Sequence, residues 1–251
     1  MFDDIDLNEI EKIAIDAGEA IMEIYKKDFD VEYKDDTSPL TEADLKANQI
    51  ICSALEEKYP NIPIMSEENK QTPYSIRKNW EYYWCIDPID GTKEFIKKNG
   101  EFTINIALIY NNTPVLGVVY APAIEEMYKA KKGQGAYKND QNLPLYHNDN
   151  PKDKLSVVAS KSHLSEETQQ FIDALDAKHI TQVSKGSSLK LCMVAEGIAD
   201  IYPRLAPTME WDTAAADAIV RESGKMTYQY NSNKPLVYNK ENLLNPWFIV
   251  Q

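Results

Sequence analysis

Apolar residues near the start of the chain recur at the spacing of an amphipathic helix. Over residues 7–27 they fall at steps of three and four, at Leu7, Ile10, Ile13, Ala14, Ala17, Ile21 and Ile24. Residues 41–59 predict a second helix. Its first residues, Thr41 to Asp44, fit a capping box, in which a threonine and an acid three residues later bond to free helix amides. On this pattern alone, Asp44 is a capping residue and not a catalytic one.

Strand patterns follow in the middle of the chain. Residues 82–86 form a short apolar run that stops at Asp87-Pro88, which predicts a buried strand followed by a polar loop. Three further runs have strand composition, at residues 102–110, 114–120 and 127–137. We expect them to form an antiparallel meander with turns at residues 111–113 and at Gly133-Gln134-Gly135.

The second half of the chain alternates strand and helix patterns. A polar, turn-rich stretch over residues 138–153 is the candidate boundary between an N-terminal α+β domain, residues 1–150, and a C-terminal α/β domain, residues 151–251. Beyond it we expect a strand and three helices, at residues 155–159, 165–177, 188–198 and 213–223. The predicted fold class is α+β with mixed sheets.

The charge balance narrows the function. The 251 residues carry 40 acidic and 27 basic side chains, a formal net charge of -13. Non-specific nucleic-acid binding needs a basic surface, so we expect no polynucleotide partner. The first residues are acidic and no apolar run approaches about 18 residues, so neither a signal peptide nor a transmembrane segment is predicted. Cys52, Cys85 and Cys192 are expected to be core thiols in a reducing cytoplasm.

The densest cluster of reactive residues is WCIDPIDGTKEF, residues 84–95. Two carboxylates three residues apart flank a proline at the end of a predicted strand and precede a glycine. Pro88 restrains the backbone and Gly91 permits a sharp turn. Asp87 and Asp90 could therefore converge on one point.

The residues between and after these aspartates offer further oxygen and nitrogen groups. The Ile89 carbonyl would be a third oxygen ligand, and the amides of Gly91 and Thr92 could hold a phosphate oxygen. The alternative is an ordinary turn with a helix cap, because aspartate before proline or glycine is common in turns. The segment alone does not decide between the two.

Two further acidic positions favour a metal site. Glu67 and Glu68 follow the strand-like run of residues 62–65, and Asp212 begins a predicted helix. Each also has an alternative, because Glu67 can be a surface residue and Asp212 a helix N-cap. Carboxylates about 4 Å apart repel by roughly 4 kcal/mol per pair at an effective dielectric near 20, so a cluster of them needs a cation or a proton. Hard oxygen donors favour Mg²⁺, with Mn²⁺ as a substitute, and disfavour zinc.

Basic residues that could meet an anionic substrate lie late in the chain. They are Lys161, His163, Lys185, Lys190 and Arg204, with Ser187 beside them. Most lysines are solvated surface groups, so this cluster alone does not define a binding site.

Taken together, these segments resemble the inositol monophosphatase superfamily. The matching motifs cover essentially the whole chain in the family's order: SEE at residues 66–68, WCIDPIDGTKEFIKKNGEFTINIALI at 84–109 and GSSLKLCMVAEGIADIYPRLAPTMEWDTAAA at 186–216. The forms DGTKEFI and EWDTAA are similar to the bacterial 3'(2'),5'-bisphosphate nucleotidase branch. Ala206 and Ala216 depart from the pattern, since relatives commonly carry glycine there.

The resemblance implies a layered αβαβα sandwich of the inositol monophosphatase and fructose-1,6-bisphosphatase type. It also implies hydrolysis of adenosine 3',5'-bisphosphate to AMP and phosphate by a metal-activated water, a step of sulfate assimilation and nucleotide salvage. Two or three Mg²⁺ ions per site and inhibition by Li⁺ belong to the same expectation. The partner would be a small phosphorylated nucleotide.

The family's site residues carry over position by position. One metal would bind Glu67, Asp87 and the Ile89 carbonyl, and a second Asp87, Asp90 and Asp212. The expected catalytic residues are Asp44, Glu67 and Thr92, with Asp44 and Thr92 orienting water, which reverses the local preference for Asp44 as a cap alone. The expected substrate-binding residues are Glu67, Ile89, Asp90, Gly91, Thr92, His163, Ser187, Lys190, Arg204 and Asp212.

Related functions stay open at this point. The same metal ligands would serve an inositol or sugar monophosphatase, and a non-catalytic, partner-binding member could keep the fold. We expect a cytoplasmic protein, with peripheral association with the inner membrane and the choice of monomer or homodimer left open.

Overall fold

A computed structural model describes residues 4–27, 31–33, 39–149, 151–159 and 165–251. Within them the main sheet has the strand order β3-β4-β5-β6-β7-β8-β9. Its strands are β3 (Ile64–Ser66), β4 (Tyr82–Asp90), β5 (Thr103–Tyr110), β6 (Thr113–Ala121), β7 (Glu126–Lys131), β8 (Ala136–Lys138) and β9 (Gln141–Asn142). Strand β3 pairs with β4 in parallel, and the other neighbours are antiparallel. The expected meander is confirmed, with Asn111 and Asn112 in positive φ at the β5–β6 turn.

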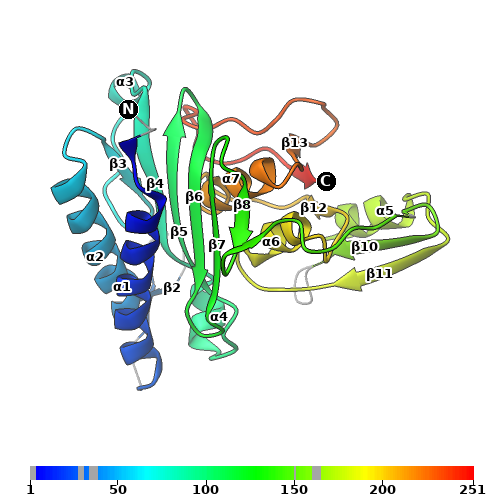
Figure 1. Cartoon of the computed structure of the whole chain (residues 1–251), viewed down its shortest axis with the longest axis horizontal. Coiled ribbons are helices and arrows are strands. Elements are labelled where there is room, and N and C mark those ends of the chain that lie inside the picture. Colours follow the sequence, from blue (N-terminus) through cyan, green and yellow to red (C-terminus); the bar gives the residue numbers. More distant parts are fainter. Residues whose placement is uncertain (1–3, 28–30, 34–38, 150, 160–164) are drawn as a thin grey trace.

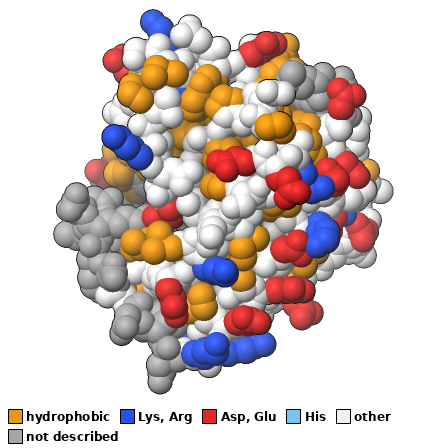
Figure 2. All heavy atoms as spheres, turned by 90° about the vertical axis from the view of Figure 1, so that its left-hand side faces the viewer, with side chains coloured by type: hydrophobic (Ala, Val, Ile, Leu, Met, Phe, Trp, Pro, Cys, Tyr) orange, Lys and Arg blue, Asp and Glu red, His pale blue; other side chains and the backbone are white. Residues whose placement is uncertain are grey.

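Two long helices cover one face of this sheet, as the apolar periodicity predicts. They are α1 (Leu7–Tyr25) and α2 (Glu42–Lys58), which lie side by side in Figure 1. Their buried residues join those of the strands in one cluster, among them Ile10, Ile21, Leu55, Trp84 and Ile104. Figure 2 shows the outer surface on this side, where acidic and basic side chains are interspersed. The described part of this face therefore has no continuous basic stripe of the kind that binds nucleic acid.

Helices from the second half of the chain cover the opposite face. These are α6 (Leu189–Glu196) and α7 (Ala214–Glu222), which pack against the sheet. Beyond them lie two smaller sheets, β10-β11 and β12-β14-β13, and helix α5. Their bounds are β10 (Lys154–Val158), β11 (His179–Val183), β12 (Tyr202–Arg204), β13 (Thr227–Gln229), β14 (Phe248–Val250) and α5 (Glu166–Asp173). Figure 1 thus shows helices, sheet, helices, strands and helix in succession, which confirms the expected sandwich.

The core beneath α6 and α7 combines residues from before and after residue 150. Cys85 and Val119 of the main sheet belong to the same buried cluster as Cys192 and Ile219 of these helices. The division into domains 1–150 and 151–251 stays a prediction. The remaining elements are the antiparallel pair β1 (Val31–Tyr33) and β2 (Pro39–Thr41) and the short helices α3 (Tyr74–Arg77) and α4 (Thr92–Ile96).

Helix α7 approaches the main sheet closely at Gly117 of β6. A Cβ atom at Gly117 would lie 2.1 Å from the backbone oxygen of Ala215, so no larger residue fits there without a shift of the helix. The start of α7, and with it the preceding residue Asp212, is thereby held against the sheet.

The expectation for the cysteines is met. Cys52, Cys85 and Cys192 are buried free thiols. In the part of the chain that the structure describes, no helix combines the length and the apolar character that a membrane crossing requires.

Candidate metal centre and substrate cleft

Strand β4 runs through the acidic motif. The predicted strand end before Asp87 is wrong, because β4 continues past Pro88 to Asp90. Its pairing with β5 shifts register on the way: Asp87 lies opposite Asn105, and Asp90 lies opposite Thr103. Three steps along β4 therefore match two along β5, which is a β-bulge, and a bulge accommodates a proline that has no N–H to donate.

The bulge directs both aspartates to one face of the sheet. In a regular strand, residues three apart point to opposite faces. Here Asp87 and Asp90 are opposite Asn105 and Thr103, which are two apart and share a face. That face is the one covered by α6, because the Ser188 hydroxyl donates to Asn105 Oδ1 at 2.8 Å and lies 2.9 Å from Thr103 Oγ1.

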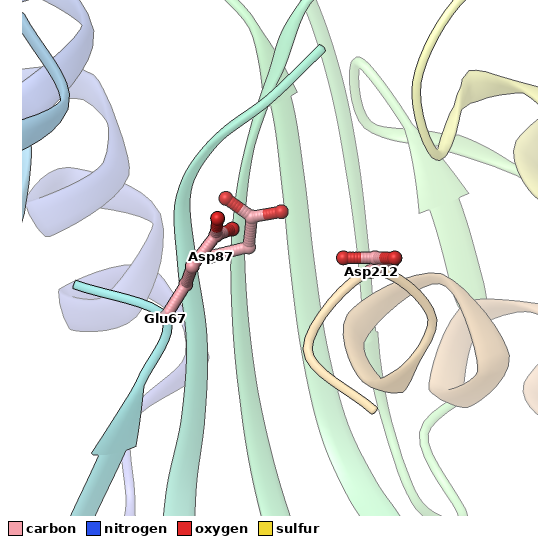
Figure 3. A group of neighbouring side chains, drawn as sticks. All are labelled: Glu67, Asp87 and Asp212. Atoms are coloured by element: carbon pink, nitrogen blue, oxygen red, sulfur yellow. The ribbon is translucent and has the colours of Figure 1, made fainter. Parts of the chain in front are cut away.

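Three carboxylates from separate parts of the chain meet at this face. Glu67 follows β3, Asp87 lies in β4 and Asp212 precedes α7, and one oxygen of each lies within 4.8 Å of the others. Figure 3 shows Glu67 and Asp87 on the sheet side and Asp212 across from them on the loop before α7. The N-cap alternative for Asp212 is wrong, since Thr213 is the N-cap and Asp212 Oδ2 instead accepts a hydrogen bond from the Met209 amide at 2.8 Å.

Burial and mutual repulsion raise the pKa values of three aspartates at this face, Asp87, Asp90 and Asp212. Burial, followed by the charges of Glu67 and Asp90, raises the pKa of Asp87 well above its usual value. Burial and then the charge of Asp90 raise the pKa of Asp212 to about 8. Burial raises the pKa of Asp90 to about 6, although the Lys190 charge opposes it. A buried set of hard oxygen donors with such pKa values fits a divalent cation, which would displace the protons.

Asp44 is both a capping residue and a neighbour of the acidic motif. Its Oδ2 accepts hydrogen bonds from the Thr41 amide at 2.8 Å and the Thr41 hydroxyl at 2.6 Å, so the predicted cap is confirmed. Its Oδ1 accepts a hydrogen bond from the Thr92 hydroxyl at 3.2 Å. That hydroxyl is also 3.3 Å from the Ile89 carbonyl oxygen, and the Ile89 amide donates to Asp87 Oδ1 at 3.1 Å. The structure thus brings the two predicted water-orienting residues together.

A cleft of about 630 Å³ lies beside the carboxylates. It is lined by several of the predicted site residues: Asp90, Gly91, Lys185, Ser187, Lys190, Arg204 and Asp212. Within the described residues, Ser187 Oγ and Arg204 Nε are buried without a hydrogen-bond partner. Burial lowers the pKa of Lys190, the Asp90 charge offsets this in part, and the Arg204 charge lowers it further. Unpaired buried polar atoms beside two basic side chains suit an anionic group of a substrate.

Gly91 has the conformation that its position in the motif predicts. Its φ is 91°, in the left-handed region, and it is the residue before α4. A Cβ atom there would lie only 3.3 Å from the Cβ of Ser187. Glycine therefore serves both the turn and the close approach of the two sides of the cleft.

Two glutamates that are not among the predicted site residues also lie in the cleft. Glu94 and Glu101 line it, and Glu101 Oε2 accepts a hydrogen bond from the Gly186 amide at 2.8 Å. Both glutamates lie within the motif of residues 84–109, but that motif does not indicate a contact with residue 186, because the contact joins segments far apart in the chain. Lys161 and His163, predicted near the substrate, lie outside the described residues.

Comparison with known proteins assigns the chain to a family. A profile of the inositol monophosphatase family matches residues 6–246. The chain belongs to the inositol monophosphatase family. Enzymes of this family depend on a metal ion, generally Mg²⁺, which agrees with the all-oxygen character of the carboxylate cluster.

Individual relatives of this family member carry more specific names. A Shigella flexneri protein named 3'(2'),5'-bisphosphate nucleotidase CysQ is 43% identical over 247 residues, which cover 97% of this chain and 98% of the relative. An Aggregatibacter actinomycetemcomitans protein of the same name is 38% identical and covers 97% and 91% of the two chains. The crystal structure of CysQ from Bacteroides thetaiotaomicron superposes with a TM-score of 0.87 at 45% identity, over 98% of this chain and 96% of that one. A Thermotoga maritima inositol monophosphatase superposes with a TM-score of 0.76 at 26% identity, over 96% and 89%.

Proposed function

We propose that this chain is a Mg²⁺-dependent 3'(2'),5'-bisphosphate nucleotidase, a phosphoric monoester hydrolase that converts adenosine 3',5'-bisphosphate to AMP and phosphate. The observation that carries the proposal is the carboxylate cluster beside a cleft that is also lined by Lys190 and Arg204. A substrate with two phosphates can place one at the metal centre and the other against these basic groups. The identity to the CysQ proteins over nearly the full length supports the same reaction.

The metal ligands in this proposal come from three segments of the chain: the residue after β3, the end of β4 and the residues before α7. Glu67, Asp87 and the Ile89 carbonyl would hold one Mg²⁺, and Asp87, Asp90 and Asp212 a second, with Asp87 shared. When bound, such ions lower the pKa of a coordinated water and neutralise charge on the leaving oxygen. The proposal also includes substitution of Mn²⁺ for Mg²⁺ and the binding of a third ion at the same site.

The protein's own groups would orient the reactants. The Thr92 hydroxyl donates a hydrogen bond to Asp44, which leaves the Thr92 oxygen able to accept a hydrogen bond from the attacking water. The amides of Gly91 and Thr92 would bind the scissile phosphate.

The remaining predicted binding residues would contact the nucleotide part of the substrate. Ser187, with its unpaired hydroxyl, would bind it together with Lys190 and Arg204. His163 stays part of the prediction, although it lies outside the described residues.

Phosphate release distinguishes this function from its alternatives. The purified protein is compared on adenosine 3',5'-bisphosphate, AMP and inositol 1-phosphate, with Mg²⁺ and with EDTA. We expect Mg²⁺-dependent turnover with preference for the bisphosphate. Preference for the inositol ester would instead indicate an inositol or sugar monophosphatase, and a protein without phosphomonoesterase activity that co-purifies with a partner would indicate a non-catalytic role.

The physiological setting is also part of the proposal. Sulfate assimilation and nucleotide salvage, a cytoplasmic location and inhibition by Li⁺ follow from the resemblance to bisphosphate nucleotidases. Inhibition by Li⁺ is checked in the same phosphate-release assay by titration against KCl at equal ionic strength.

A further inference from the structure

Asp212 lies on a loop, residues 208–213, that is held by a segment near the C-terminus. We call residues 208–213 the Asp212 loop and residues 239–245 the strap. Met209 of the loop forms an antiparallel bridge with Leu244 of the strap. The Glu210 amide donates to the Leu243 carbonyl at 3.0 Å. The loop that presents the carboxylate is therefore paired with a distant part of the chain.

Asn245 makes several of the contacts between the strap and the Asp212 loop. Its side chain is buried, and its Nδ2 donates to the Met209 carbonyl at 2.8 Å and to Thr213 Oγ1 at 3.0 Å. Its backbone amide donates to the Thr208 carbonyl at 2.8 Å. These bonds reach the loop on both sides of Asp212.

Two of these bonds act directly on the group that holds the Asp212 carboxylate. The Thr208 carbonyl and the Met209 amide belong to one planar peptide unit, so a bond that fixes the carbonyl also fixes the direction of the N–H. That N–H donates to Asp212 Oδ2 at 2.8 Å. The side chain of Asn245 fixes the next carbonyl along the chain, that of Met209. The backbone on both sides of Met209 is thus set by Asn245.

The orientation of the Asn245 amide is itself determined by an ion pair between Lys240, which is partly exposed, and the buried Glu210. Lys240 Nζ donates to Asn245 Oδ1 at 3.2 Å and to Glu210 Oε1 at 2.6 Å. Because a lysine ammonium only donates, it faces the amide oxygen, and the amide nitrogen is left for the Asp212 loop. Glu210 is fully buried and also accepts the Asn239 amide at 2.6 Å, so the strap is anchored at both of its ends.

We infer that Asn245 is a positioning residue for Asp212, holding its carboxylate in the arrangement with Glu67 and Asp87 that binds a divalent cation. This inference rests on the proposed metal-binding role of the cluster. Hydrogen-bond partners of metal ligands typically change metal affinity or activity by about 10–100-fold when they are removed. Loss of the Asn245 amide should therefore weaken Mg²⁺ binding more than substrate binding.

The test compares Asn245→Ala and Asn245→Asp with Asn242→Asp, a matched control at an exposed strap residue whose side-chain oxygen, which accepts the Leu244 amide at 3.0 Å, is kept by aspartate. Asn245→Asp keeps the side-chain shape and the Lys240 contact but removes both donors, which separates loss of the hydrogen bonds from loss of volume. The Mg²⁺ concentration for half-maximal thermal stabilisation is measured first, and then that for half-maximal phosphate release. Circular dichroism of the metal-free variants checks the fold.

For both Asn245 variants we expect the Mg²⁺ midpoint to rise by about tenfold or more in the two assays. At saturating Mg²⁺, kcat should recover to within a few fold of wild type, and KM for the bisphosphate should change by less than about twofold. Asn242→Asp should match wild type. Folded Asn245 variants with an unchanged Mg²⁺ midpoint would make Asn245 a purely structural residue and overturn the inference.

The two proposals fail in different ways. A wild-type protein that is stabilised by Mg²⁺ but hydrolyses no bisphosphate contradicts the proposed function, while the thermal midpoints still decide the role of Asn245. A wild-type protein with no stabilisation by Mg²⁺ overturns the positioning role itself.

Discussion

Replacing Asp212 by asparagine should stabilise the metal-free protein while it removes catalysis. Asparagine keeps the shape of the side chain, and its amide oxygen can still accept the hydrogen bond from Met209. It cannot ionise, so it removes one of the mutually repelling charges of the cluster. The substitution therefore separates two effects of the cluster: the destabilisation by charge repulsion in the absence of metal, and the contribution to catalysis in its presence.

The distances and the raised pKa set the expected magnitude. Oxygens of Glu67, Asp87 and Asp212 lie within 4.8 Å of one another, and unit charges at about that distance repel by roughly 3.5 kcal/mol at an effective dielectric near 20. The pKa of Asp212 is raised from 3.8 to about 8, so between these values the folded protein keeps a proton that the unfolded chain has lost. The free energy of unfolding of the metal-free wild type should therefore fall as the pH rises, by at most about 1.4 kcal/mol per pH unit from this carboxyl group.

Urea unfolding in EDTA at pH 5 and pH 8 measures this effect. At pH 8 we expect metal-free Asp212→Asn to be more stable than wild type by about 3 kcal/mol, with a smaller difference at pH 5. In Mg²⁺ the order of stability of the two proteins should change, since the wild type gains stability from metal binding and the variant gains less. The kcat for phosphate release should fall by more than about a hundredfold.

Asp217→Asn is the matched control for this experiment. Asp217 is also a buried aspartate near the start of α7, but it has a cationic partner, because Arg221 lies 2.9 Å from its Oδ2. Its replacement should destabilise the protein by about 3 kcal/mol with or without Mg²⁺. If Asp212→Asn behaved like this control in EDTA at pH 8, or kept wild-type turnover, the account of a repulsive metal-binding cluster would be refuted.

Three further substitutions test other parts of the structure. Gly117→Ala should lower the free energy of unfolding by about 3 kcal/mol in urea titrations, because its Cβ would lie 2.1 Å from the Ala215 backbone oxygen. Gly18→Ala should cost less, because its Cβ would approach a side chain, that of Tyr120, and at the longer distance of 2.6 Å. Lys190→Met should raise KM for adenosine 3',5'-bisphosphate at least about tenfold in the phosphate-release assay, and an unchanged KM would remove this lysine from the substrate site. Thr92→Val should lower kcat by about a hundredfold with little change in KM, whereas a matching rise in KM would indicate binding rather than orientation of water.

Much of the architecture is already contained in local sequence patterns. The stripe of apolar residues in 7–27 predicts α1, the strand-like runs predict the meander, and the Thr41 and Asp44 pair predicts the cap of α2. These features depend on neighbours within a few residues, so periodicity and capping rules detect them. The oxygen-rich motifs likewise indicate a site for a hard cation before any contact is known.

By itself, then, the sequence determined the helices, the meander, the family motifs and the kind of ligand atoms. Only the tertiary structure decided how these atoms are presented. The bulge that directs Asp87 and Asp90 to one face depends on register with β5, and the hold on Asp212 depends on Asn245 at the far end of the chain. Contacts between segments so far apart leave no period in the sequence, because they arise from packing of the whole chain and not from the conformational preferences of neighbouring residues.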